Sequence, residues 1–251
     1  MRALFLGTGT SHGVPRIGCK CDVCTSNDPK DKRYRCSLLI EQDDYSVVID
    51  TAVEFRLQVL RANINHIDAL FYTHNHADHM NGIDDVRIFT RQGDLNVYGP
   101  DEVLKDIESR FPYTVASNNL IRGLPNLKLN RIDSSGVKIG PLHFYPVPLV
   151  HGFSQVFGYR VGKLAYLTDC KEIPQSSLPL LEGVEVLIID ALRFKEHSTH
   201  MSIDEAIETA NFLKVKKSYL THLDHDISHS DLERYLPDNI YPAYDTLELI
   251  I

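Results

Sequence analysis

One six-residue segment of the 251-residue chain, His-Asn-His-Ala-Asp-His at positions 74–79, restricts its fold more than any other. In an extended backbone alternate side chains share a face, so His74 and His76 point to the same side and can bind one metal ion. Asp78 and His79 follow where the chain turns, and they can serve a second metal ion beside the first. The fold therefore has to support two neighbouring cations at this segment.

Polar residues with possible chemical roles follow five predicted strands. The endings are Ile49-Asp50, Thr73-His74, Thr168-Asp169, Ile189-Asp190 and Thr221-His222. Taken singly, each is more readily a turn aspartate or a surface histidine. In α/β sheets, however, ligands bind outside the strand ends, so five such endings indicate one shared crevice.

Short apolar segments alternate with amphipathic segments along the whole chain, with no Pro- or Ser-rich linker and no repeat. We predict helices at 53–62, 101–109, 202–213 and 231–236. Predicted strands cover 3–6, 37–41, 46–49, 69–72, 95–98, 142–146, 156–161, 164–167, 186–189 and 218–220. In the third helix, Ser202 and Glu205 have the spacing of a capping box. The pattern predicts a single α/β domain over residues 1–251.

The charge balance excludes one class of function. Twenty-six Lys and Arg residues stand against 34 Asp and Glu residues, a net charge of −8, which is the wrong sign for coating nucleic acid or anionic lipid. No apolar run approaches the ~18 residues of a membrane span. The start, Met1 to Leu6, is too short for the apolar region of a signal peptide. We therefore expect a cytoplasmic protein.

Three of the five cysteines, Cys19, Cys21 and Cys24, lie close together. A Cys-x-Cys spacing is awkward for a disulfide, whereas clustered thiolates are typical of a tetrahedral zinc site. The fourth ligand has to come from elsewhere, and we choose His225. It follows His222 by three residues, so it would pin the N-terminal loop against the crevice. We predict a structural zinc in a Cys-rich knuckle at 18–25.

With these motifs the chain resembles the metallo-β-lactamase superfamily over nearly its whole length. In that family a His-x-His-x-Asp-His loop follows a strand and supplies ligands to a two-metal site at the edge of an αββα sandwich. The resemblance implies a first metal ion at His74, His76 and His151, a second at Asp78, His79 and His222, and Asp169 bridging them. Manganese and zinc both suit such ligands. True β-lactamases usually have cysteine at the position of Asp169, so that activity is not expected.

The implied ligand set favours a substrate with one negative charge. Two divalent cations contribute roughly +4, Asp78 and Asp169 −2, and a bridging hydroxide −1, which leaves about +1 with neutral histidines. A phosphodiester would neutralise this charge.

Within the superfamily, the knuckle together with Gly7-Thr8-Gly9-Thr10 and Gly13-Val14-Pro15 resembles the PhnP branch. These are cyclic phosphodiesterases that act on phosphoribosyl cyclic phosphate. In that branch, and more loosely in ribonuclease Z, a histidine in this region assists phosphoryl transfer without binding metal, and His200 matches it best. The expected function is hydrolysis of a small, cyclic, ribosyl- or nucleotide-like phosphodiester by a metal-bridging hydroxide, with His200 and Asp78 as catalytic residues.

Three other functions remain open. A ribonuclease Z-like RNA processing nuclease would need a long basic or Gly-rich arm, and the net charge of −8 gives no reason to expect long nucleic acid. A glyoxalase II-like thioester hydrolase shares the seven ligands but has no need of the knuckle. The complete ligand set argues against a noncatalytic binding module. The sequence leaves the oligomeric state open, including a homodimer.

Some residues receive no role from the sequence. His12 is more readily a loop histidine than a crevice residue, and His197 is the alternative to His200. Surface or packing positions are expected for Cys36, Cys170, His66, His143 and His229. A solvated charge run, with a phosphate contact as the alternative, is expected for Lys30, Lys32, Arg33 and Arg35.

Overall fold

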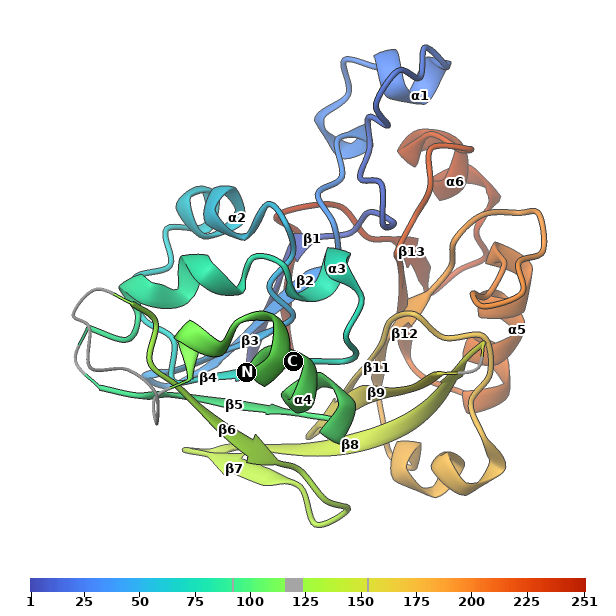
Figure 1. The fold of residues 1–251 in the computed structure, drawn as a ribbon. Coiled ribbons are helices and arrows are strands. Elements are labelled where there is room, and N and C mark those ends of the chain that lie inside the picture. Colours follow the sequence, from blue (N-terminus) through green and yellow to red (C-terminus); the bar gives the residue numbers. More distant parts are fainter. Residues whose placement is uncertain (92, 116–123, 153) are drawn as a thin grey trace.

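Two sheets packed face to face form the body of the protein (Figure 1). The computed structural model describes residues 1–91, 93–115, 124–152 and 154–251. Within these ranges each sheet has seven strands, in the orders β14-β1-β2-β3-β4-β5-β6 and β13-β12-β11-β10-β9-β8-β7. Helices pack against the outer faces, which gives the predicted αββα sandwich in a single domain.

The first sheet consists of β1 (Arg2–Gly7), β2 (Ser37–Gln42), β3 (Tyr45–Ile49), β4 (Ala69–Phe71), β5 (Leu95–Gly99), β6 (Leu127–Arg131) and β14 (Glu248–Ile250). The second consists of β7 (Val137–Ile139), β8 (Leu142–His151), β9 (Ser154–Val161), β10 (Leu164–Leu167), β11 (Val186–Asp190), β12 (Lys217–Thr221) and β13 (Ile240–Pro242). The α-helices are α1 (Asp22–Thr25), α2 (Phe55–Ala62), α3 (Ala77–Met80), α4 (Asp101–Arg110), α5 (Ile203–Leu213) and α6 (His229–Tyr235). Short 3-10 helices are η1 (Pro29–Asp31), η2 (Ile83–Ile88), η3 (Pro112–Thr114) and η5 (Gln175–Leu181).

The central strands are apolar on both faces because both faces are buried. In β3, Val47 and Ile49 face the space between the sheets, whereas Val48 faces the helices outside. Between the sheets, the ring of Phe71 from β4 stacks on that of Phe144 from β8 at a centroid distance of 4.3 Å. This continuous apolar filling fixes the register of the strands that carry the site.

Parallel pairing brings the polar strand endings to one edge. Strands β3 to β6 are parallel in the first sheet, and β10 to β13 are parallel in the second. The carboxyl ends of neighbouring parallel strands lie at the same edge of a sheet. The residues that follow β3, β4, β10, β11 and β12 are therefore neighbours in space.

Most of the predicted elements are present with shifted ends, and β10 has the predicted limits. The helix predicted from residue 53 begins at Phe55, because Thr51 instead pairs its backbone with His79 and Gly82. The helix predicted at 231–236 is α6, which starts after the N-cap Ser228. The capping box of Ser202 and Glu205 is present.

Strand β8 continues past the predicted end at Pro146 to His151. Beyond Phe144 this strand no longer pairs with β7, so its outer edge tolerates proline, which lacks a backbone donor. The sequence analysis did not predict β6, β7, β13, β14, α1 or α3. These are short, and the four strands lie at or next to sheet edges, where polar residues interrupt the alternation.

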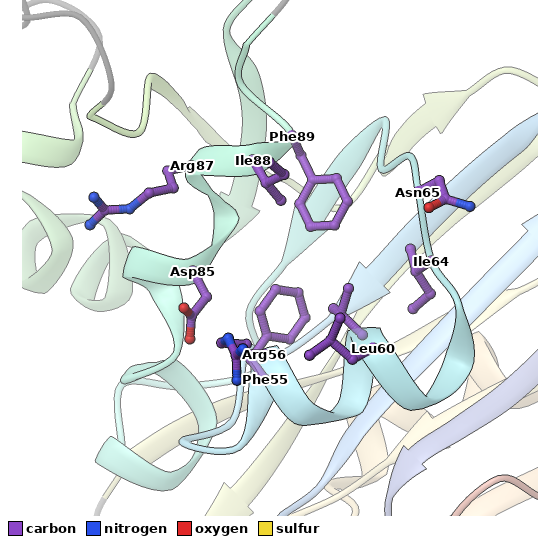
Figure 2. Close-up of a pocket in the computed structure, with 10 residues that line it drawn as sticks. Phe55, Arg56, Leu60, Ile64, Asn65, Asp85, Arg87, Ile88 and Phe89 are labelled. Atoms are coloured by element: carbon purple, nitrogen blue, oxygen red, sulfur yellow. The ribbon is translucent and has the colours of Figure 1, made fainter.

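A hollow of about 410 Å³ lies on the outer face of the first sheet, between α2 and η2 (Figure 2). Its lining includes Phe55, Leu60, Ile64 and Phe89 together with Arg56. None of its lining residues belongs to the predicted metal sites. Among the described residues, no helix is long and apolar enough to cross a membrane.

Candidate metal centre

The side chains predicted to bind two metal ions lie together at the carboxyl edge of both sheets. One potential ligand atom from each member of a group lies within 4.8 Å of the others in that group. The first group is His74, His76, His151 and Asp169, and the second is Asp78, His79 and His222. This grouping matches the two sets implied by the resemblance, and the ligand roles themselves stay predictions.

Asp169 lies between the two groups. Its Oδ1 is 3.0 Å from Nε2 of His79, and its Oδ2 is 3.4 Å from Nε2 of His222. The same Oδ2 lies 3.7 Å from Nε2 of His74. The carboxylate therefore lies within reach of both groups: Oδ2 is near His74 of the first group, and both oxygens are near imidazoles of the second.

Three of the strand endings adopt left-handed backbone conformations. The φ angles are 63° at Asp50, 52° at Asp169 and 60° at His222. Such angles are uncommon for residues other than glycine, and strained backbone of this kind clusters at functional sites. Asp169 and His222 thereby join the ligand groups, and Asp50 reaches the ring of His79.

Three buried imidazole nitrogens lack the hydrogen-bond partners that such atoms normally have. The Nε2 atoms of His74, His79 and His222 are buried and have no hydrogen-bond partner among the described residues. The opposite nitrogen, Nδ1, lies 2.9 Å from Thr73 Oγ1 in His74 and 2.7 Å from Asp50 Oδ2 in His79. A buried polar atom without a partner is costly, and a metal ion would satisfy all three. The residues present thus fit two divalent cations.

Electrostatics couple these groups tightly. Burial acts to raise the pKa of Asp169, but His222 and His79 hold it well below its ordinary value. Burial acts to lower the pKa of His222, but Asp169 and Asp78 raise it to about 9. In the first group, burial lowers the pKa of His74 well below its ordinary value. Neutral imidazole is the form that binds metal, so a cation in the second group replaces a proton on His222.

Two further aspartates support the histidines from behind, and both are fully buried. Asp50 accepts a hydrogen bond from the His79 ring and two more from the backbone and hydroxyl of Thr73. Asp190 accepts from the backbone of Cys170 at 2.7 Å and from His200 Nδ1 at 2.8 Å. The sequence analysis placed both aspartates at the crevice without assigning this role. Their position at strand ends was the available signal.

His200 is buried beside the second group. Its ring lies parallel to that of His222 at a centroid distance of 4.6 Å, and 4.6 Å from the ring of His151. Because Nδ1 bonds to Asp190, the other nitrogen is free to face the crevice. A ring nitrogen of His200 also lies within 4.8 Å of possible ligand atoms of Asp169 and His222, and the catalytic role of His200 stays a prediction.

The three clustered cysteines and His225 also come together. Nδ1 of His225 lies 3.3 Å from Sγ of Cys21 and 3.8 Å from Sγ of Cys19, and Cys24 completes the group. Nitrogen and sulfur ligands of one tetrahedral zinc lie about 3.6 Å apart, given the usual bond lengths. The geometry therefore fits the predicted knuckle zinc, and Cys21 is also the N-cap of α1.

The expectation of a solvated basic run is wrong for Arg33, whose side chain is fully buried. Its guanidinium donates to the backbone carbonyls of Asp224 and Ile227 and lies 3.5 Å from the carboxylate of Asp31. Asp224 and Ile227 belong to a segment far away in the sequence, which local charge patterning does not reveal. Arg33 thus connects the N-terminal loop that carries the knuckle at 18–25 to the segment that carries His222 and His225.

The other residues without a predicted role lie as follows. His12 is exposed, as expected of a loop histidine, and Cys36 and Cys170 are buried. His66 is exposed, and His229 is buried against the ring of Tyr244. His143 is half-buried beside Tyr145. Lys30 lies over the ring of Tyr244, Lys32 bonds to the carbonyl of Cys24, and Arg35 pairs with Glu54.

Replacing Cys21 with serine is expected to remove one zinc per chain and to lower the melting temperature. Thiolate is the strong zinc ligand here, and structural zinc contributes directly to folding free energy. Metal analysis and thermal unfolding of Cys21→Ser measure both effects. The matched control is Lys20→Ser, which changes the exposed neighbour and keeps all three thiols. An unchanged zinc content in Cys21→Ser would refute the knuckle assignment.

Comparison with known proteins places this geometry in a family. Residues 45–223 match the beta-lactamase superfamily domain family. A crystal structure of a new diphosphatase from the PhnP family is 40% identical in sequence, with a TM-score of 0.93, and the match covers 100% of this chain and 98% of that one.

Two curated relatives also match. An octanoyltransferase of Porphyromonas gingivalis is 40% identical over 255 residues, and this chain spans about half, 52%, of its length. A ribonuclease Z of Anoxybacillus flavithermus is 23% identical over 284 residues, covering 89% of this chain and 86% of that protein. The family match, and above all the full-length identity with the diphosphatase, show that this chain belongs to the PhnP family of the metallo-β-lactamase superfamily.

Proposed function

We propose that this chain is a metal-dependent phosphodiesterase that hydrolyses a small phosphodiester, such as a cyclic ribosyl or nucleotide-like one. The observation that carries the proposal is the pair of ligand groups that share Asp169, with unpaired imidazole nitrogens facing the space between them. A site with about one net positive charge favours a phosphorus centre that carries one negative charge. Membership of the PhnP family agrees with a hydrolase of this kind.

The two histidine groups would hold two divalent cations, manganese or zinc, and His225 with the three cysteines would hold a structural zinc. When bound, a cation pair supplies an activated water and neutralises charge on the phosphoryl oxygens. The protein's part is to fix the ligands. Asp50 holds the ring of His79, and the carbonyl of Thr199 accepts from Nδ1 of His151 at 2.8 Å.

Two side chains are proposed to act on the reacting groups. Asp78 is the more exposed of the two ligand carboxylates, at 13% of its side chain against 2% for Asp169, so it can also orient the attacking water. His200, held by Asp190, is proposed to donate a proton to the leaving oxygen. The hydrogen bond to Asp190 keeps the ring in one orientation during that transfer.

Diphosphate hydrolysis is the second candidate, because the PhnP-family structure with 40% identity over the full length is a diphosphatase. A diphosphate esterified at both ends carries one negative charge on each phosphorus, as a phosphodiester does. The charge of the site therefore suits both substrates. The substrates differ in the leaving group, which is an alcohol in one case and a phosphate monoester in the other.

The names of the curated relatives carry less weight. About half of the P. gingivalis octanoyltransferase lies outside the match, so its name does not assign an activity to the matched half. The ribonuclease Z relative has only 23% identity, and the net charge of −8 gives no support to binding long RNA.

The test is a substrate panel with protein loaded with manganese or zinc. It contains bis-p-nitrophenyl phosphate, a ribosyl cyclic phosphodiester, a diphosphate esterified at both ends, and an acyl thioester. We expect turnover of the phosphodiesters. Hydrolysis of the thioester alone, by protein with full metal content, would overturn the proposal in favour of a glyoxalase II-like activity.

A further inference from the structure

The loop between β11 and α5 carries a second histidine beside His200. The ring of His197 lies 5.2 Å from that of His200, on which the ring of His222 stacks in turn. His197 is only partly buried, whereas His200 and His222 are buried. His197 is thus an outer member of this row of imidazoles.

Hydrogen bonds define which nitrogen of His197 carries a proton. Its Nδ1 accepts from the backbone N–H of Thr199 at 3.3 Å and lies 3.1 Å from the Thr199 hydroxyl. A neutral imidazole that accepts at Nδ1 carries its hydrogen on Nε2. That Nε2–H has no hydrogen-bond partner among the described residues. His197 therefore presents a fixed, unused donor.

Arg193 lies four residues before His197, and little negative charge compensates its guanidinium. Its Nε is buried and has no hydrogen-bond partner in the described part of the chain. Among the described residues, its guanidinium has one ion-pair contact, with Oδ2 of Asp224 at 4.0 Å. By contrast, Lys171 is paired with Glu205. Burial, His200 and Arg193 all lower the pKa of His197, which keeps this donor neutral.

We propose that Arg193 and His197 form a subsite for a second phosphate group of the substrate, on the leaving-group side of the reacting phosphorus. This inference rests on the proposed metal-dependent phosphoester hydrolysis and favours its second candidate substrate, a diphosphate. Arginine binds phosphate oxygens through two donors at once, and a neutral imidazole N–H adds a third. The subsite adjoins His200, which is proposed to face the leaving oxygen.

Hydrolysis of such a substrate adds one water across the P–O–P link. The water oxygen bonds to the attacked phosphorus, the bond from that phosphorus to the bridging oxygen breaks, and two phosphate monoesters leave. The departing monoester takes the electron pair of the broken bond, and both protons of the water pass to solvent as the two monoester dianions form. A leaving phosphate needs charge stabilisation more than a proton, and Arg193 and His197 supply it.

The test compares two aryl substrates that differ in the second phosphate, P,P′-diphenyl diphosphate and bis-p-nitrophenyl phosphate. Arg193→Gln and His197→Ala are each expected to lower kcat/KM for the diphosphate by about 10- to 100-fold, the range for losing a hydrogen bond to a charged group. The phosphodiester should change by less than about threefold, because it has no group for the subsite. Lys195→Gln is the matched control, since it removes a positive charge from an exposed position of the same loop.

Calorimetric binding of methylenediphosphonate and methylphosphonate gives a readout without turnover, with metal content measured afterwards to show that neither ligand strips metal. We expect both variants to weaken the diphosphonate selectively and Arg193→Lys to restore part of its affinity. Equal effects on both substrates, or no selective loss of diphosphonate affinity, would overturn the subsite. If metal-loaded wild-type protein hydrolyses neither substrate, the proposed function fails, and selective diphosphonate binding alone still supports the subsite.

Discussion

His200→Ala is expected to slow hydrolysis of an alkyl cyclic phosphodiester by about 10² to 10⁴ in kcat, the usual contribution of general acid catalysis. An alkoxide is a poor leaving group, so it needs a proton or a hydrogen bond as the P–O bond breaks. His200 is buried beside both ligand groups, with Nδ1 bonded to Asp190 and no hydrogen bond from its other nitrogen to any described residue. A p-nitrophenyl ester has a leaving group that needs no proton, so its hydrolysis should slow much less.

The metal content of the His200→Ala variant distinguishes a general acid from a metal ligand. It should stay at the wild-type level in His200→Ala, and His66→Ala, which changes an exposed histidine elsewhere, should behave as wild type. If His200→Ala strips metal or slows both substrates equally, His200 is a ligand or a phosphate-binding group. If neither rate changes, the acid role is wrong and His197 becomes the next candidate.

Asp169→Ala is expected to have the larger effect, a loss of kcat/KM that exceeds roughly 10⁴-fold, the upper end of what acid catalysis alone supplies. This carboxylate lies within 3.0 to 3.7 Å of three imidazole nitrogens from both groups. Its removal leaves each predicted cation without one ligand and removes the negative charge that both share. Metal analysis of the purified variant should show loss of the active-site ions, with the knuckle zinc retained.

The control for this change is Asp238→Ala, which removes an exposed carboxylate at a distance in sequence from the ligands. It should keep wild-type metal content and activity. An Asp169→Ala protein that binds the same metals as wild type and retains activity within tenfold would show that Asp169 does not bridge.

The central strands could be predicted from the sequence because both of their faces are buried. Strand β10 reads Leu-Ala-Tyr-Leu, four buried residues, and the structure gives it the predicted limits. The short outer strands could not be predicted, because edge positions accept polar residues and proline. In β6, for example, Lys128 and Arg131 are exposed and hide the alternation.

The candidate site could be predicted where its residues are close in sequence or end a strand. The segment 74–79 and the strand endings at Asp169 and His222 indicated one crevice, the two ligand groups with His151 were implied by the family resemblance, and His225 followed from its spacing to His222. The burial of Arg33 could not be predicted, because its partners Asp224 and Ile227 are nearly two hundred residues away. Nor could the bonds of Asp50 and Asp190 to histidine rings, which depend on how neighbouring strands are aligned.

The central claim is a dinuclear metal centre. Its most direct test is the metal content of protein purified without any chelator, combined with anomalous diffraction at the metal absorption edges. We predict three ions per chain, one at the cysteines and two at the groups that share Asp169, with the latter two roughly 3.5 to 4 Å apart. Less than one ion per chain outside the cysteine cluster, or an ion pair away from Asp169, would contradict a dinuclear centre in this chain.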